Sequence, residues 1–378
     1  MPLIIIWVIL TIFGILAIYS VSIHESFTKT LLWIAKWTRT DDPSNYFYFF
    51  RQIRSIGMSL IMAAITYAIP IKFFQKNKNV TIIAVLLMLL QISVFIPGIW
   101  IVLNGARGWI DIAFLPSIQP SEFFKLWYVL FLWWWLIRKR DIVNTKKFFI
   151  SFLIVNAIIF FVFFLIPDLW TMMILGIVGL IMCRYIGGKI KYIIWIVAGG
   201  IVATILLGTI AGSISPKFAY IQKRVTYFID SSVDPQARQV WWQNQQALLA
   251  IGGWGLLGKW YGKWLQKFWF IPEAQSDFIF SAFSEEIGFV GNMVLLGLYL
   301  YIGYYFLTRL RYIKDEHKKI IGIGILSLIL IQAFVNIWVN TKILPNTGLT
   351  LPFISYWWTA LMVNFIEIVL LYKIIKNK

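Results

Sequence analysis

The stretch PEAQSDFIFSAFSEE, residues 272–286, gathers four carboxylates in a chain that has only 16 acidic residues among 378. They are Glu273, Asp277, Glu285 and Glu286. Asp277 stands directly before a long apolar segment, where it can cap a helix, act as a general base, or do both. Glu285 and Glu286 lie two helical turns further on. Because buried carboxylates need partners, structural pairing with Lys125 or with neighbouring helix ends is the better interpretation of these two.

Other ionisable side chains also occur in apolar segments, where a charge is costly and therefore indicates a site or an ion pair. Glu122 and Lys125 are three residues apart in IQPSEFFKLWYVL, on one face of an expected helix. They form either a structural ion pair or a site in which Lys125 meets an anionic substrate. Asp168 follows a proline in IPDLWT, so it can cap the helix that begins after the proline ends the previous one.

Two irregular segments carry further candidates for ligand contacts. Arg107 and Trp109 occur in NGARGWIDIAF. This pair is either an interfacial anchor or a ligand contact, because the flanking glycines let the backbone approach a ligand. The segment VNTKILPNTGLTLPFISYW, residues 339–357, is broken by proline and glycine, which predicts a cavity wall inside the protein. A cavity for an anionic amphiphile is therefore expected, lined or rimmed by Arg107, Lys125, Asp168, Glu273 and Asp277.

The composition places the chain in a membrane. Hydrophobic residues make up 60% of it, charged residues 13%, and the mean hydropathy is +0.79, whereas a soluble domain is about half apolar and a quarter charged. A spanning helix needs about 20 apolar residues. We predict an all-α polytopic membrane protein with ten spans, at about 3–22, 52–70, 80–102, 118–137, 148–166, 168–186, 192–212, 278–307, 320–340 and 354–374.

The basic residues predict the orientation of these spans. The net charge is +18, and more than half of the Lys and Arg residues fall in short connections on one side or at the C-terminus. Positive residues favour the cytoplasmic side, so both termini are expected in the cytoplasm. The charge then needs no nucleic-acid partner. The first segment lacks a basic start and a cleavage site, so it is expected to be a spanning helix rather than a removed signal.

The loops on the opposite side are longer and carry the unusual polar residues. The longest, 213–277, connects the seventh and eighth spans and is patterned like short amphipathic helices at an interface. We find no internal repeat and no soluble domain, so we predict one transmembrane domain over residues 1–378. Cys183 is the only cysteine and both histidines are isolated, which predicts neither a disulfide framework nor a metal cluster.

These motifs, in this order, resemble the SEDS family, the FtsW/RodA/SpoVE proteins of bacterial cell-wall synthesis. The likeness is carried by NGARGWI, SIQPSEFFKL, PDLWT, IPEAQSDFIFSAFSEEIGFVG and NIWVNTKILPNTGLTLPFISY, and GLTLPFISY is more similar to the FtsW branch. The resemblance implies an inverting glycosyltransferase that polymerises lipid II, as donor and acceptor, outside the cytoplasmic membrane in division or elongation. It implies as partners a class B penicillin-binding protein transpeptidase and other divisome or elongasome membrane proteins.

The resemblance also implies roles for individual residues. The essential acid of the family corresponds to Asp277, which as a general base would deprotonate the attacking 4-hydroxyl while undecaprenyl pyrophosphate leaves. Arg107 and Lys125 are candidates to stabilise that leaving group. A divalent cation, Mg²⁺ or Mn²⁺, can assist, although the sequence shows no dedicated site. The motifs add further expected substrate contacts, namely Trp109, Glu122, Gln275, Ser276, Asn336, Pro345 and Ser355.

The sequence departs from the family pattern in two ways. Gln275 replaces a histidine that the family usually has before the essential acid. Tryptophan also stands where the family typically has glycine, at Trp170, Trp254, Trp260, Trp338, Trp357 and Trp358. One hypothesis is that these codons are UGA read as glycine by the organism. The other is a tryptophan-rich divergent member, and UGG codons at the six positions would establish it.

Two other functions remain open. A flippase or transporter of lipid-linked precursors also has many helices and buried charges, and a non-catalytic scaffold of the division complex would share the family likeness. Transporters often contain paired repeats and offer access from both sides. Here the unusual polar residues concentrate on one side, which favours chemistry there.

Overall fold

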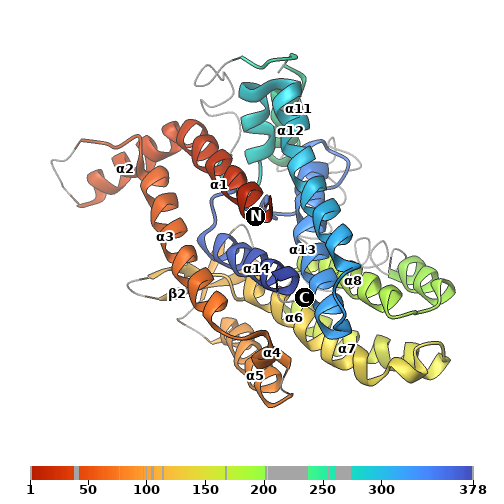
Figure 1. Cartoon of the computed structure of the whole chain (residues 1–378). Helices are drawn as coiled ribbons and strands as arrows, with labels where there is room; N and C mark the ends of the chain where they lie inside the picture. Colours follow the sequence, from red (N-terminus) through yellow and green to blue (C-terminus); the bar gives the residue numbers. More distant parts are fainter. Residues whose placement is uncertain are drawn as a thin grey trace. The chain divides into compact units, whose positions relative to one another are not determined.

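The computed structural model of the chain describes residues 2–37, 42–75, 77–96, 98, 100–103, 106–112, 115–166, 168–200, 202, 237–253, 255–259 and 274–376. Most of its helices and strand β2 are labelled in Figure 1. The chain groups into two compact units that are each built from separated segments. The first unit comprises residues 1–65, 227–308 and 332–368, and the second comprises residues 66–226, 309–331 and 369–378.

The first unit contains the N-terminal helices and most of the helices near the C-terminus. Its elements are α1 (Pro2–Val21), α2 (Ile23–Trp37), most of α3 (Phe47–Ala68), α11 (Ala237–Gly252), most of α12 (Ile279–Leu310), the end of α13 (Glu316–Asn340) and the start of α14 (Trp358–Lys376).

The second unit contains the middle of the chain. Its elements are α4 (Ile71–Gln75), α5 (Asn77–Ile92), η1 (Ser93–Phe95), β1 (Trp100–Leu103), β2 (Ala106–Ile112), β3 (Leu115–Ile118), α6 (Pro120–Arg138), η2 (Arg140–Ile142), α7 (Lys146–Leu165), α8 (Leu169–Tyr185) and an apolar helix at Ile190–Gly200. The start of α13, the end of α14 and the end of α12 also belong to it.

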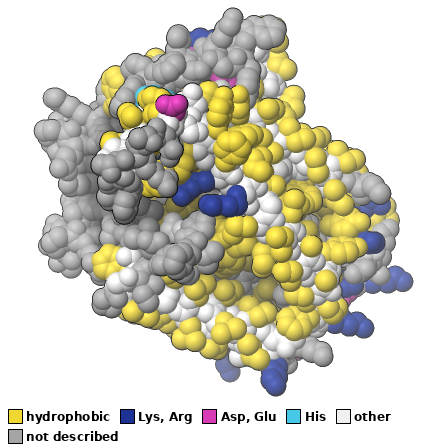
Figure 2. Space-filling model, turned by 90° about the vertical axis from the view of Figure 1, so that its left-hand side faces the viewer, with side chains coloured by type: hydrophobic (Ala, Val, Ile, Leu, Met, Phe, Trp, Pro, Cys, Tyr) yellow, Lys and Arg dark blue, Asp and Glu magenta, His cyan; other side chains and the backbone are white. Residues whose placement is uncertain are grey.

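The helices support the prediction of a polytopic membrane protein. In the described ranges, six helical segments are long and apolar enough to cross a bilayer, at α1, Lys78–Phe95, α7, α12, α13 and α14. All six overlap predicted spans. Large apolar side chains are also exposed on several of them, such as Leu16, Ile158 and Val294, and Figure 2 shows a face covered largely by hydrophobic side chains. Lipid contact accounts for such a surface, while the total of ten spans stays a prediction.

The structure corrects two segment predictions. Residues 23–37, expected in a loop, form the helix α2, which contains both polar and apolar residues. Its first turn contains Glu25, and a carboxylate is stabilised there by the helix dipole. The third span, expected to reach residue 102, ends with η1, and a three-stranded antiparallel sheet follows. Strands β1 and β2 pair Ile101 with Trp109 on either side of an Asn-Gly dipeptide, the usual signal of a tight hairpin.

The second unit packs around α6, most of which is buried. The Phe124 ring packs edge-on against Phe163 of α7, with centroids 5.0 Å apart. The Tyr128 hydroxyl donates to Oδ1 of Asn156, also on α7, at 2.5 Å. On α8, Gly179 leaves room for the same hydroxyl, because a Cβ there would collide with it. Aromatic packing and one buried polar contact thus fix the neighbours of α6.

In the first unit, α12 is broken at Gly288 and a second backbone segment docks onto the break. Gly288 has φ +68° inside the helix, a region that favours glycine. The backbone N–H groups of Phe289 and Val290 donate to the carbonyls of Gly255 and Leu256 at 3.0 and 3.1 Å. Residues 255–259 therefore satisfy backbone groups that the break releases, as irregular backbone at membrane depth requires.

The unusual tryptophans are accommodated where the structure describes them. The Trp338 side chain is 45% exposed, so it has room at the surface and does not overpack the interior. Trp170, Trp357 and Trp358 are half-buried, and Trp254 and Trp260 lie outside the described residues. The codon hypothesis therefore stays a hypothesis.

Replacing Gly288 by alanine should destabilise the fold. The new Cβ would collide with the backbone of Gly258, and alanine would have to adopt φ +68°. A left-handed residue costs about 1–3 kcal/mol even without a collision. We expect the purified variant in detergent to unfold at a temperature several degrees lower, measured by intrinsic fluorescence.

A matched control lies on the same helix. A Cβ at Gly297 would meet no atom within 4 Å, and alanine is favoured over glycine in a helix interior by about 1 kcal/mol. Gly297→Ala should leave the unfolding temperature unchanged or slightly raise it. Equal losses in the two variants would contradict the role assigned to the break.

Candidate functional site

Asp277 lies in the turn directly before α12, and two amides of α13 hold its backbone. Its carbonyl oxygen accepts hydrogen bonds from Nδ2 of Asn336 at 3.0 Å and from Nδ2 of Asn340 at 2.9 Å. Oδ1 of Asn340 accepts from the backbone N–H of Ser281 in the first turn of α12, at 3.1 Å. Because both amides are fully buried, they fix the position of the Asp277 backbone, while the residue itself is half-buried.

The irregular segment 341–357 forms the other side of this turn. The Ser355 hydroxyl donates to the carbonyl of Ser276 at 2.7 Å, and the backbone N–H of Tyr356 donates to the carbonyl of Gln275 at 2.8 Å. Gly348, with φ +71°, comes so close that a Cβ there would lie 3.6 Å from Oδ2 of Asp277. The segment therefore runs past the carboxylate, while its predicted role as a cavity wall stays a prediction.

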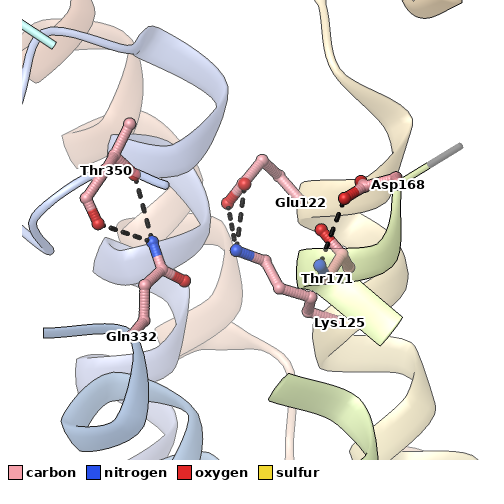
Figure 3. Close-up of polar contacts among 6 residues, drawn as sticks. All are labelled: Glu122, Lys125, Asp168, Thr171, Gln332 and Thr350. Atoms are coloured by element: carbon pink, nitrogen blue, oxygen red, sulfur yellow. Dashed lines mark hydrogen bonds and ion pairs between the residues drawn. The ribbon is translucent and has the colours of Figure 1, made fainter. Parts of the chain in front are cut away.

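Buried amides keep this segment in place. Nε2 of Gln332 on α13 donates to the carbonyl and hydroxyl oxygens of Thr350, at 3.1 and 3.0 Å (Figure 3). Asn336 also donates to the carbonyl of Leu349 at 2.7 Å. Amide side chains that bind backbone carbonyls in an irregular segment supply the hydrogen bonds that a helix would otherwise provide.

The predicted substrate contacts of this unit take different positions. Asn336 and Ser355 donate their hydrogen bonds to backbone carbonyls, which indicates that they position the turn. Gln275 is buried, and its Oε1 meets no partner among the described residues. Pro345 is half-buried in the segment, and Ser276 is buried beside Asp277. Contact of these residues with a substrate stays a prediction.

Glu285 and Glu286 take part in structural contacts, as the sequence indicated, but with other partners. Oε1 of Glu285 pairs with Nζ of Lys259 at 2.6 Å. Oε1 of Glu286 accepts a hydrogen bond from the hydroxyl of Ser20 on α1. The partners were not foreseen, because Lys259 and Ser20 are brought near α12 only by the tertiary fold.

Three other predicted residues lie in the second unit. Nζ of Lys125 binds both carboxylate oxygens of Glu122, at 2.9 and 2.8 Å, and both residues are buried (Figure 3). Of the two interpretations, the ion pair is therefore present. Asp168 caps α8, because its Oδ1 accepts from the backbone N–H of Thr171 at 3.1 Å.

The remaining predicted residues are only partly placed. Arg107 and Trp109, expected in a loop, belong to strand β2, and Trp109 is half-buried. Glu273 lies outside the described residues, as does most of the loop 213–277. Within the ranges given above, no group of three or more His, Cys, Asp or Glu side chains comes together as a metal site.

Sequence reasoning missed Asn340 and Gln332. A usable signal was present, since Gln332, Asn336 and Asn340 recur every four residues in the ninth predicted span. Three amides on one helix face, at the period that aligns side chains, indicate a polar stripe that needs partners.

Comparisons with known proteins agree with this arrangement. A family model described as "Cell cycle protein", for FtsW, RodA and SpoVE, matches residues 1–378. Stage V sporulation protein E of Bacillus subtilis is 30% identical over 357 residues, which cover 94% of this chain and 90% of that protein. A probable peptidoglycan glycosyltransferase FtsW of Allochromatium vinosum is 32% identical, with 87% of this chain and 80% of that protein covered.

Solved structures have the same fold. A chain of a peptidoglycan synthase complex, described as coordinating polymerization and crosslinking, aligns with a TM-score of 0.73 at 19% identity and covers 99% of this chain and 97% of its own. The rod shape determining protein RodA of Thermus thermophilus aligns with a TM-score of 0.64 at 20% identity and covers 99% and 96%. From the match over its whole length and from these relatives, the chain belongs to the FtsW/RodA/SpoVE family.

Proposed function

We propose that the protein is a peptidoglycan glycosyltransferase, which polymerises lipid II on the outer face of the cytoplasmic membrane with Asp277 as its base. The observation that carries the proposal is the turn before α12, where two buried amides and the segment 341–357 hold one half-buried carboxylate. Its relatives include proteins named as probable peptidoglycan glycosyltransferases. A single positioned carboxylate is what an inverting transfer to a hydroxyl requires.

The reaction needs one proton transfer and one bond exchange. The Asp277 carboxylate takes the proton of the acceptor sugar's 4-hydroxyl, and that oxygen attacks the anomeric carbon of the donor. The bond from this carbon to the pyrophosphate oxygen breaks, and undecaprenyl pyrophosphate leaves as an anion without needing a proton. Attack opposite the leaving group turns the α-linked donor into a β-linkage. The rigid backbone around Asp277 limits the cost of aligning the base with the hydroxyl.

The surroundings of the reaction are also part of the proposal. A class B penicillin-binding protein transpeptidase is the proposed partner, together with other membrane proteins of the divisome or elongasome, and both termini lie in the cytoplasm. The fold shared with a peptidoglycan synthase complex that coordinates polymerization and crosslinking supports a partner of this kind. Mg²⁺ or Mn²⁺ can assist the leaving group, and chelation by EDTA tests whether either ion is needed.

The purified protein, combined with its cognate transpeptidase, should convert labelled lipid II into glycan chains. The assay separates this function from the two alternatives. A flippase would move labelled lipid II across vesicle membranes and leave it monomeric, and a scaffold would do neither. If the transpeptidase without this protein also converts lipid II into glycan chains, the assay no longer supports polymerisation by this protein.

Asp277→Asn should abolish most of this activity. The amide keeps the size of the side chain but cannot accept the proton, and loss of a general base costs about 10²–10⁴-fold in rate. We expect the rate of glycan formation to fall at least about a hundredfold, with unchanged binding of lipid II. Asp141→Asn, at an exposed acid of η2, is the control and should keep the full rate. A variant at 277 with wild-type rate would exclude this residue as the base.

Asn340→Leu should lower kcat about tenfold while KM changes little. The leucine removes one donor to the Asp277 carbonyl and the acceptor for the Ser281 N–H. The carboxylate of Asp277 is then less well aligned for proton transfer, while substrate binding is retained. Thr341→Val is the neighbouring control, because the Thr341 hydroxyl donates only to carbonyls of its own helix. An equal change of kcat in both variants, or a rise of KM alone, would contradict the positioning role.

A further inference from the structure

The start of α3 presents two arginines that lie outside the family motifs quoted above. Arg51 and Arg54 are three residues apart on α3, so they share one helix face, and Arg51 is half-buried while Arg54 is exposed. Like charges at this spacing repel each other. In the part of the chain that the structure describes, no carboxylate forms an ion pair with either guanidinium. Their positive charge favours the binding of an anion.

Packing places this pair next to the Asp277 turn. The rings of Tyr48 on α3 and Tyr356 meet edge to face with centroids 4.9 Å apart. Arg51, Arg54 and Glu25 all lie close enough to Tyr356 to act on its side chain electrostatically. Tyr356 in turn donates its backbone N–H to the carbonyl of Gln275. One residue thus separates the arginines from the turn that carries Asp277, and all these residues belong to the first unit.

The local charge is positive and one guanidinium is oriented. Lys29 on α2 donates to the Tyr48 hydroxyl at 3.0 Å, and that hydroxyl donates to Oε1 of Glu25 at 3.0 Å. Three cations (Lys29, Arg51 and Arg54) against the one carboxylate of Glu25 leave an excess of two positive charges. The Arg51 guanidinium also lies over the Phe47 ring, 4.5 Å from its centroid. A stacked guanidinium presents its N–H groups in a fixed plane, which suits a phosphate.

Basic side chains are also visible on the surface. Figure 2 shows Lys and Arg side chains beside hydrophobic side chains on the described part of one face. Cations beside apolar surface suit a ligand that carries both a phosphate and a hydrocarbon chain.

We propose that Arg51 and Arg54 bind the pyrophosphate of the lipid-linked substrate beside Asp277. The inference rests on the proposed function, because it assigns the leaving group of that reaction to a site. Two guanidiniums one helical turn apart can each bind one phosphate in bidentate fashion. They take the role that the sequence analysis gave to Lys125, whose ammonium is buried in an ion pair with both oxygens of Glu122. The phosphate of a bilayer phospholipid shares this chemistry and is the alternative source.

The test measures binding and not polymerisation. The full-length protein in nanodiscs is titrated with fluorescently labelled undecaprenyl pyrophosphate, and in a second arm with labelled phosphatidylglycerol. We expect Arg51→Gln combined with Arg54→Gln to weaken binding of the pyrophosphate lipid about tenfold or more, with little change for phosphatidylglycerol. Arg51→Lys should recover part of the loss, because it restores the charge without the planar fork. High salt should weaken binding of the pyrophosphate lipid to the wild type, because salt screens the charges. The double variant should show a smaller dependence on salt.

Controls separate a binding role from a folding role. Arg311→Gln, at an exposed arginine just after α12, removes the same charge elsewhere and should bind both lipids as the wild type does. The unfolding temperature is measured for every variant, and the single variant at the exposed Arg54 keeps the test valid should the double variant fail to fold.

The outcomes are distinct. Unchanged binding of the pyrophosphate lipid in the Arg54 variant and the double variant overturns the proposal. A loss of binding that is confined to phosphatidylglycerol, or equal for both lipids, overturns it as well. Either loss would assign the two arginines to the bilayer headgroups. Asp277→Asn should bind the pyrophosphate lipid normally. If binding depends on the arginines but the wild type makes no glycan chains, the proposed function fails while the binding site stands.

Discussion

The two hydrogen bonds from Asn336 and Asn340 to the carbonyl of Asp277 are the constraint on which the site depends. They join the end of α13 to the turn just before α12, where the backbone is not helical. An unsatisfied carbonyl in such a place costs about 1–3 kcal/mol. The amides therefore stabilise the fold and position the carboxylate with the same bonds, so that the site and the helix packing cannot be altered independently.

The same pairing of irregular backbone with distant partners occurs elsewhere in the first unit. Regular helices satisfy their own backbone groups, but a carboxylate at the mouth of a helix needs nearby backbone that is not helical. Segment 341–357 provides it, and Gln332, Asn336 and Ser355 compensate its free groups. The break of α12 at Gly288 is compensated in the same way by residues 255–259. Both irregular pieces of backbone are thus matched by donors or acceptors from another part of the chain.

Much of this architecture could be predicted from the sequence, because apolar segments of about 20 residues and proline or glycine breaks are local signals. The start of α12 just after Asp277, the cap of α8 by Asp168 and the irregular segment were found in this way. The sheet of β1–β3 was missed, since short apolar strands beside a spanning segment resemble its continuation. The partners of Glu285 and Glu286 were missed for another reason, because pairs that are far apart in sequence leave no local pattern.

The cations considered as ligands of the leaving group differ in whether a carboxylate pairs with them in the described part of the chain. From the sequence, Lys125 was an attractive cation because it lies inside an apolar helix, where a charge is costly. The cost, however, is met by Glu122, which neutralises the ammonium through both of its oxygens. Arg51 and Arg54 attracted no attention because they begin a helix at an expected loop boundary, where cations are common. Their position beside Tyr356 and the Asp277 turn becomes apparent only in three dimensions. Among the described residues, no carboxylate forms an ion pair with Arg51 or Arg54. A pyrophosphate that binds these arginines therefore displaces none of the ion pairs found there.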